Sequence, residues 1–161
     1  MALIIETGAI IANANSYTTD AELVAYALAR GVTIPALESD RDILQIKAVD
    51  FINDNEQSMQ GTRTDSTQEL SFPRVSVYVH DYLIGSNTIP TTLKKAQLEA
   101  AIVAYTQTLI TSETLQNVSK EKADVLEVSY FQNGKRTTTN FSTVYNYLSP
   151  VLADNTKLVR T

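Results

Sequence analysis

The sequence predicts a mainly α fold: a small bundle of about four helices with an added β-hairpin and extended terminal arms. Alternation of apolar and polar residues, the pattern of a strand, is confined to short stretches such as residues 75–79. Hydrophobic residues make up 43% of the chain and charged residues 19%, as in ordinary globular proteins, so a core can form. Apolar residues recur at helical spacing in four segments: 19–30, 39–55, 89–109 and 141–152.

The length of 161 residues suits one domain, because domains usually contain roughly 100 to 200 residues. We therefore expect a single domain over residues 1–161. Its core should lie at about residues 14–152, and a C-terminal arm should follow at 154–161.

The N-terminal part is expected to be an extended arm or edge strand followed by a helix. Short apolar pieces at residues 3–5 and 9–12 make up the arm. Thr19 and Glu22 have the spacing of a capping box, in which each side chain accepts a hydrogen bond from the backbone of the other residue. The helix should end before Gly31, and its apolar stripe consists of Leu23, Val24, Ala27 and Leu28.

The second helix is predicted to open with the same cap pattern, formed here by Ser39 and Asp42, and to run to about Asn55. Its buried face follows from apolar residues at positions i, i+4, i+7 and i+8. Two isoleucines, Ile43 and Ile46, widen this face. The face itself consists of Leu44, Ala48, Phe51 and Ile52.

The polar, irregular segment at residues 56–74 is too long for a simple turn. We predict that its second part is ordered because Leu70 and Phe72 are anchored in the helical core. Arg63 or Arg74 should then bond to a carboxylate or to a backbone carbonyl.

A strand is predicted directly after this segment. Val75, Val77 and Val79 alternate with polar residues, which is the pattern of a strand with one buried face. Residues 82–84 either return as a partner strand or simply pack on the core.

The third helix begins at Ile89 or Pro90, since proline suits the first helical turn, and runs to about Leu109. It is apolar on two sides, which predicts burial between neighbouring helices or contact with a second subunit. One side consists of Leu93, Ala96, Ala100 and Val103, and the other of Leu98, Ile102, Tyr105 and Leu109.

The C-terminal third is predicted to contain a linker at residues 111–124, a hairpin and a short helix. Asn133-Gly134 between strand-like segments is a strong hairpin signal. The fourth helix, at 141–152, is ended or bent by Pro150, and its apolar residues are Val144, Tyr145, Leu148 and Leu152.

The composition excludes several classes of function. The absence of cysteine removes disulfides, thiol catalysis and cysteine-ligated metal sites. No apolar run reaches the roughly 18 residues of a membrane span, and the N-terminus lacks the pattern of a signal peptide. We therefore expect a soluble, unexported protein without membrane contact. The net charge of −5 and the pI near 4.8 make nonspecific binding of duplex DNA a poor expectation.

We predict that the protein is not an enzyme, with no catalytic, cofactor-binding or metal-binding residues. His80 is the one histidine, and the polar phase of its strand should leave it exposed. No glycine-rich phosphate loop and no Gly-x-Ser-x-Gly element occurs. The acidic pairs Asp40/Asp42 and Glu121/Asp124 fit a first helical turn and a linker.

Binding of single-stranded DNA stays open as an alternative. A hairpin that carries aromatic and cationic side chains can stack single-stranded bases. The basic pairs are Lys94-Lys95, Lys120/Lys122 and Lys135-Arg136, and the aromatic residues near the last pair are Tyr130, Phe131 and Phe141.

An ordered series of motifs spans about residues 4–105. It consists of Ala14-Asn15-Ser16-Tyr17, Arg30-Gly31, Lys47-Ala48-Val49-Asp50-Phe51-Ile52, Gly61-x-Arg63-x4-Gln68-x-Leu70-x-Phe72-Pro73-Arg74 and Ile89-Pro90-x-x-Leu93-Lys94-x-Ala96. The series, and most specifically its fourth motif, resembles a family of tailed-phage head–tail connector proteins, the adaptor or head-completion proteins. Members of this family are sometimes labelled DnaT-like single-stranded-DNA-binding proteins. The chain departs from the family pattern in having Phe72 where tryptophan often precedes Pro-Arg, and in having no tryptophan after Arg-Gly.

The resemblance implies a structural virion protein, made in the host cytoplasm and located at the head–tail junction. It implies a homo-oligomeric ring of twelve subunits between the portal and the tail or the next connector ring. Double-stranded DNA would pass through the lumen without specific binding. The implied partners are the portal protein and further neck or tail proteins, and no cofactor is implied.

Two segments are predicted to bind these partners. The hairpin at Asn133-Gly134 would be marginal alone and should pack on an adjacent chain. The C-terminal arm should dock on the portal or the next ring as an extended peptide, through Lys157, Leu158, Val159 and Arg160.

Overall fold

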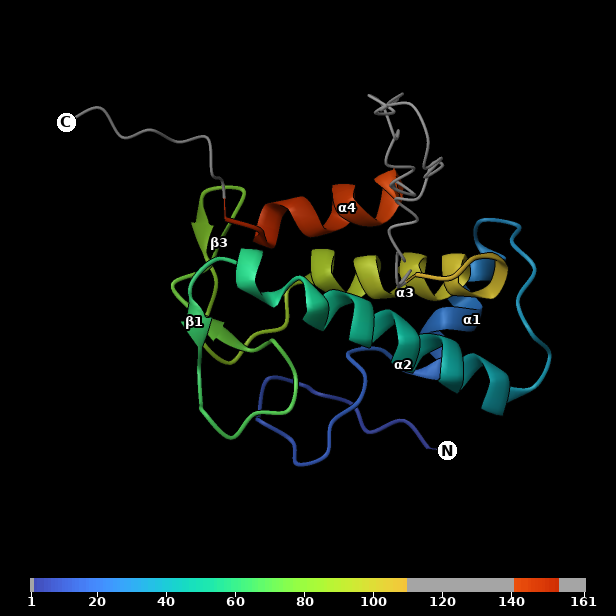
Figure 1. The fold of residues 1–161 in the computed structure, drawn as a ribbon, viewed down its shortest axis with the longest axis horizontal. Helices are drawn as coiled ribbons and strands as arrows, with labels where there is room; N and C mark the ends of the chain where they lie inside the picture. The colour runs from blue at the N-terminus through green and yellow to red at the C-terminus, as the bar shows by residue number, and fades with distance from the viewer. Residues whose placement is uncertain (1, 110–140, 154–161) are drawn as a thin grey trace, which may run out of the picture. The chain divides into compact units, whose positions relative to one another are not determined.

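Four α-helices and two short antiparallel β-hairpins make up the described part of the computed structural model, residues 2–109 and 141–153 (Figure 1). The prediction of a mainly α fold is confirmed. The helices are α1 (Asp20–Leu28), α2 (Glu38–Asp54), α3 (Thr91–Thr106) and α4 (Ser142–Leu148), with 3-10 turns η1 (Glu56–Ser58) and η2 (Ser149–Val151). The strands are β1 (Thr62–Arg63), β2 (Arg74–Val75), β3 (Tyr78–Val79) and β4 (Tyr82–Leu83). The linker predicted at 111–124 and the hairpin predicted at Asn133-Gly134 lie outside the described residues.

Helix α1 begins with the predicted capping box. The Thr19 hydroxyl accepts a hydrogen bond from the Glu22 N–H at 3.2 Å, and the Glu22 carboxylate accepts one from the Thr19 N–H at 2.7 Å. Gly31 follows the helix with φ of +64°, as expected for a C-terminal stop. The predicted apolar stripe is only half correct, because Leu23 and Ala27 are buried while Val24 and Leu28 are exposed.

Helix α2 does not use the predicted Ser39/Asp42 cap. Its N-cap is Leu37, whose side chain makes no hydrogen bond to the helix. The start of the helix is stabilised instead by Arg41, a residue of the first turn. Arg41 donates to the carbonyl oxygens of Pro35 and Ala36 at 3.0 and 2.6 Å, and two further nitrogens bind the Asp20 carboxylate of α1. A long-range ion pair therefore fixes this helix start, which a local capping pattern cannot reveal. The predicted buried face is confirmed, but Ile43 is exposed.

Helix α3 packs between α2 and α4 and also contacts α1 (Figure 1). Of the two predicted explanations for its two apolar sides, burial between neighbouring helices is therefore confirmed. Tyr105 is an exception, since it is exposed. Helix α4 ends at Leu148, and Pro150 lies in the 3-10 turn that follows, as predicted. None of the helices in the described part is both long and apolar enough to cross a membrane.

The predicted continuous strand at 75–79 is wrong. Ser76 has φ of +60°, which breaks the chain into β2, paired with β1, and β3, paired with β4. Of the two alternatives for residues 82–84, Tyr82 and Leu83 form the partner strand. His80 is exposed as expected, but it lies in the β3–β4 turn, where His80 and Asp81 have φ of 52° and 67°. Two successive positive φ values are typical of the tight turns that join twisted strands.

The N-terminal arm is a closed loop rather than an edge strand, with one parallel bridge between Ile5 and Ser16. The buried Glu6 carboxylate organises this loop by accepting backbone N–H groups of Gly8, Ile10 and Ile11 at 2.7, 3.1 and 2.7 Å. A carboxylate that accepts three such bonds can stay buried, because its charge is solvated by the backbone.

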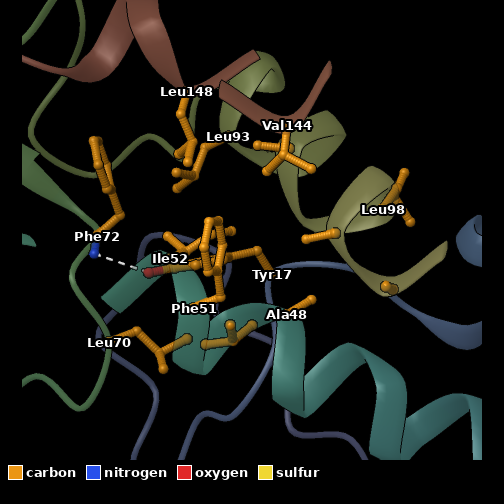
Figure 2. Packing of buried hydrophobic residues seen from close by; sticks show 14 of the residues in the cluster. Tyr17, Ala48, Phe51, Ile52, Leu70, Phe72, Leu93, Leu98, Val144 and Leu148 are labelled. Carbon is orange, nitrogen blue, oxygen red and sulfur yellow. Dashed lines mark hydrogen bonds between the residues drawn. The ribbon is translucent and has the colours of Figure 1, made fainter. Parts of the chain in front are cut away.

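A single hydrophobic core joins the helices, and its largest fully buried side chain is Tyr17 (Figure 2). The Tyr17 hydroxyl accepts a hydrogen bond from the Phe72 N–H at 3.0 Å and lies 3.1 Å from the Ser71 hydroxyl. The Tyr17 N–H donates to the Gln97 side chain of α3 at 2.9 Å. Burial raises the pKa of Tyr17 to about 12. The core therefore contains a fully buried hydroxyl, that of Tyr17, whose hydrogen-bond partners are Phe72 and Ser71.

The Tyr17 hydroxyl gives the first prediction. Tyr17→Phe should lower the free energy of unfolding by about 1–3 kcal/mol, because it leaves the buried Phe72 N–H without an acceptor. Urea denaturation followed by circular dichroism measures this change. The matched control is Tyr145→Phe, which removes an exposed hydroxyl bound to Asn55 only at 3.5 Å and should change stability by less than about 0.5 kcal/mol. Equal losses in the two variants would contradict the role given to Tyr17.

Candidate functional site

The Gly61–Arg74 segment is built around one carboxylate. Glu56, in the 3-10 turn after α2, binds both arginines of the motif, and we call Glu56, Arg63 and Arg74 the arginine clamp. Arg63 donates to both Glu56 oxygens at 2.6 Å and to the Gln68 carbonyl at 2.8 Å. This two-pronged geometry is the strong form of an ion pair.

Arg74 is the buried member of the clamp. It donates to the carbonyl oxygens of Gln60 and Gly61 at 2.7 and 2.8 Å, and to Glu56 at 3.1 Å. A further, longer bond of 3.4 Å reaches the Ser71 carbonyl. With Leu70 and Phe72 also buried, the prediction that this segment is ordered by two anchors and an arginine is confirmed.

The other motif residues complete the same structure. The Gln68 side chain accepts from the Asp65 N–H at 3.1 Å and donates to the Leu70 carbonyl at 2.7 Å, so it closes the loop. The peptide bond between Phe72 and Pro73 is cis. Gly61 has φ of +66°, and a Cβ there would lie 1.9 Å from the Val75 carbonyl oxygen. The motif therefore has a structural explanation in every residue.

The electrostatics of the clamp follow from this geometry. The pKa of Glu56 is lowered, first by the hydrogen bonds from Arg63, while burial opposes the shift and Arg74 adds to it. The pKa of Arg63 is raised for the reciprocal reason, its bonds to Glu56. The guanidinium groups of Arg63 and Arg74 both donate their hydrogen bonds to acceptors of the same chain.

An open hollow of about 550 Å³ lies beside the clamp. Its lining is mostly polar and includes two carboxylates, and the one cation in the lining, Arg74, has its donors occupied. The hollow therefore does not suit a phosphate or another anion. It is lined by Asn53, Asp54, Glu56, Gln57, Met59, Gly61 and Arg74. Among the described residues, no three His, Asp or Glu side chains converge on a possible metal position.

Positive charge is scarce on the described part of the chain. It contains seven Lys and Arg against thirteen Asp and Glu. Each of the four arginines forms an ion pair with a carboxylate of the same chain: Arg30 with Glu99, Arg41 with Asp20, and Arg63 and Arg74 with Glu56. Only the three lysines, Lys47, Lys94 and Lys95, form no such pair with a described residue.

The residues proposed for stacking single-stranded DNA are not brought together in the described part. Phe141 is buried and packs edge-on against Phe51 at 5.9 Å, so its ring is not available to a base. Lys95 lies 6.0 Å from the Tyr147 ring of α4. Lys120, Lys122, Tyr130, Phe131, Lys135 and Arg136 lie outside the described residues, as do the predicted partner-binding residues Asn133, Gly134, Lys157, Leu158, Val159 and Arg160.

Two exposed apolar surfaces were not predicted. The first, which we call the α1 face, consists of Ala21, Val24, Ala25 and Leu28, and Leu28 is 79% exposed. The second, the hairpin tip, consists of Tyr78, Tyr82 and Leu83, which are 52%, 77% and 62% exposed. The sequence held a clue to the first, because α1 is apolar on both sides, but it did not show which side faces solvent.

The fold and the site define a small helical domain whose motifs maintain structure and whose exposed features are apolar surfaces. Comparison with protein families gives its family: residues 1–161 match the model described as "Putative DnaT-like ssDNA binding protein", and the chain belongs to this family. Comparisons with curated proteins and with solved structures find no match.

The close approach at Gly61 gives the second prediction. Gly61→Ala should lower the free energy of unfolding by at least about 3 kcal/mol, because the new methyl group would force the backbone at the Val75 carbonyl to shift. Thermal and urea denaturation measure the loss. The matched control is Gly31→Ala, which has nearly the same φ of +64° but nothing within 4 Å, and should cost only about 1 kcal/mol. A similar loss of stability in both variants would show that the backbone near Val75 shifts easily to accept the methyl group, which would contradict this prediction.

The third prediction concerns pH. Because the pKa of Glu56 is lowered in the folded state, its contribution is complete above the ordinary value of 4.5 and is lost as the pH falls through the folded value. Glu56→Gln should therefore be less stable than the natural protein at pH 7, by about 2 kcal/mol, and the difference should shrink in acid. Urea denaturation from pH 7 to pH 3 measures it. Glu69→Gln, at an exposed carboxylate, is the control and should be as stable as the natural protein at pH 7.

Proposed function

We propose that this protein is a structural subunit of a tailed-phage particle. It would form a ring between the portal and the tail or the next connector ring, with the genome passing through the ring. The observation that carries this proposal is the internal use of positive charge: all four arginines of the described part are paired with carboxylates of their own chain. A surface so poor in available cations suits a subunit that binds proteins and leaves DNA unbound.

The acidity of the chain supports a role around moving DNA. Twelve subunits at −5 each would carry about −60, so the walls of such a ring would repel the phosphate backbone. DNA could then slide through without sticking. The motif series of residues 4–105 supports the same proposal through its resemblance to connector proteins.

The exposed apolar surfaces support assembly. Soluble monomers rarely keep several large apolar side chains exposed together, and such patches commonly bind other proteins. Two surfaces of the described part carry such residues: Leu28 on the α1 face, and Tyr82 and Leu83 on the hairpin tip, are all more than half exposed. In this proposal the Asn133-Gly134 hairpin and the arm at Lys157–Arg160 add contacts to adjacent chains and to the portal.

Binding of single-stranded DNA is the second candidate. The description of the matching family favours it, and so do the basic and aromatic residues between 120 and 136. These residues would have to supply the cationic and stacking surface that the described part lacks.

The fourth prediction separates the two candidates. The purified full chain should co-purify with the portal protein of its phage as a ring, measured by native mass spectrometry and electron microscopy. It should leave a single-stranded oligonucleotide unshifted at micromolar protein and low salt. Micromolar binding that weakens steeply with added salt, together with no association with the portal, would replace the connector proposal by the DNA-binding one.

A further inference from the structure

We propose that the hairpin tip of one copy docks on the α1 face of the next copy, in a head-to-tail contact. This inference deepens the proposed function and rests on it, since it names the surfaces through which the ring would be built. Its starting point is that the described chain leaves two different apolar surfaces uncovered.

The α1 face has the form of a receiving surface. Its residues lie at positions i, i+3, i+4 and i+7, so they form one continuous strip on the side of α1 opposite the buried Leu23 and Ala27. Ala21 and Ala25 allow close approach, while Leu28 projects. The nearest acidic groups are already occupied: Glu22 binds Thr19, and Asp20 binds Arg41. Asp20 is thus paired with a cation, while Glu22 lies at the edge of the strip and can stay in contact with water when the strip is covered.

The hairpin tip has the form of an inserting element. Tyr78 and Leu83 are directly opposite in the register, so their side chains lie on the same face of the hairpin. The base of the hairpin is fixed, because Val77 is fully buried and the Tyr78 N–H donates to the Gln60 side chain at 3.0 Å. A fixed base with an exposed tip can contribute apolar area to a contact without a large loss of conformational freedom.

The two surfaces belong to opposite ends of α2, as Figure 1 shows for the hairpin strands and α1. The hairpin is bonded to Gln60, just beyond the last residue of α2, whereas α1 is bonded through Asp20 to Arg41 in the first turns of α2. A helix of 17 residues is about 25 Å long. One copy therefore cannot cover its own α1 face with its own hairpin. A contact between different surfaces of successive copies closes a ring when the rotation between copies divides a full turn.

The charges at the edges of the two surfaces are complementary. Asp81 is exposed in the turn of the hairpin. Arg30 lies just past the α1 face, stacked on the Tyr26 ring at 3.3 Å. Its Nε is 3.4 Å from Glu99 and its Nη1 donates to the Tyr26 carbonyl, while its Nη2 makes no hydrogen bond to a described residue and can donate to a second carboxylate. An approach of Asp81 to Arg30 of the next copy would orient the hairpin, and the otherwise acidic chains would meet through their uncharged surfaces.

The absence of cysteine in the natural chain allows a direct test. In the full-length protein, Leu28→Cys and Leu83→Cys are introduced singly and together, and disulfides are formed by mild oxidation at the highest soluble concentration. The double variant should give a ladder of covalent oligomers on a non-reducing gel. A mixture of the two single variants should give dimers and nothing larger, and neither single variant alone should cross-link.

A second pair of variants measures the contact without cross-linking. Leu28→Asp and Leu83→Asp should each weaken self-association by at least about 100-fold, because a carboxylate would be buried without a partner. Mixing the two should restore dimers, since each variant keeps one intact surface. Ile4→Asp, at an exposed apolar residue outside both surfaces, is the control and should associate normally. Sedimentation velocity measures all four samples.

The outcomes separate this proposal from the proposed function. If the natural chain joins the portal ring but the double cysteine variant forms no ladder, the contact proposed here is wrong and the connector role stands. If single cysteine variants cross-link by themselves, the contact pairs like surfaces and the proposal is also wrong. If Tyr82→Ser instead weakens binding of a single-stranded oligonucleotide, the hairpin tip stacks bases, and both proposals fail.

Discussion

The pairing of buried polar groups around Tyr17 is the constraint on which the fold depends. Leaving a buried hydroxyl or amide without a partner costs more free energy than a made hydrogen bond contributes. The segments near Tyr17 are therefore held in positions that bring their polar groups together. Gln97 of α3 donates to the Ser16 hydroxyl at 2.7 Å and accepts from the Tyr17 N–H, while Thr18 donates to Gln45 of α2 at 2.7 Å. This network locks the segment before α1 to the antiparallel pair of α2 and α3, and the bond to Phe72 then places the arginine clamp.

The clamp shows why a basic motif need not be a binding motif. Arg63 and Arg74 stand in the most specific part of the sequence, yet their donors are directed to Glu56 and to backbone carbonyls. A guanidinium group with its fork occupied has little left for a phosphate. The same holds for Arg41, which holds α2 to α1. The arginines of the described part thus stabilise the domain, and three lysines, Lys47, Lys94 and Lys95, are its cations without an ion pair to a described residue.

Sequence reasoning succeeded where the determining interaction is local. The Thr19/Glu22 box, the stop at Gly31 and the inner faces of α2 and α3 all follow from spacing within one element. It failed at Ser39, because a long-range pair between Arg41 and Asp20 decides that helix start. It failed again at Ser76, because alternation does not show where a non-glycine residue takes a positive φ. Order in the Gly61–Arg74 segment was foreseen, but the shared role of Glu56 was not, since no local rule joins it to both arginines.

The Tyr17 network also sets an order of events during synthesis. Tyr17 leaves the ribosome early, but its partners Phe72 and Gln97 follow 55 and 80 residues later. The fully buried Val144 and Leu148 of α4 are translated later still. Contacts of such high sequence separation make folding slow and leave apolar surface exposed in the nascent chain. The domain therefore cannot complete its core on the ribosome until α4 has been synthesised.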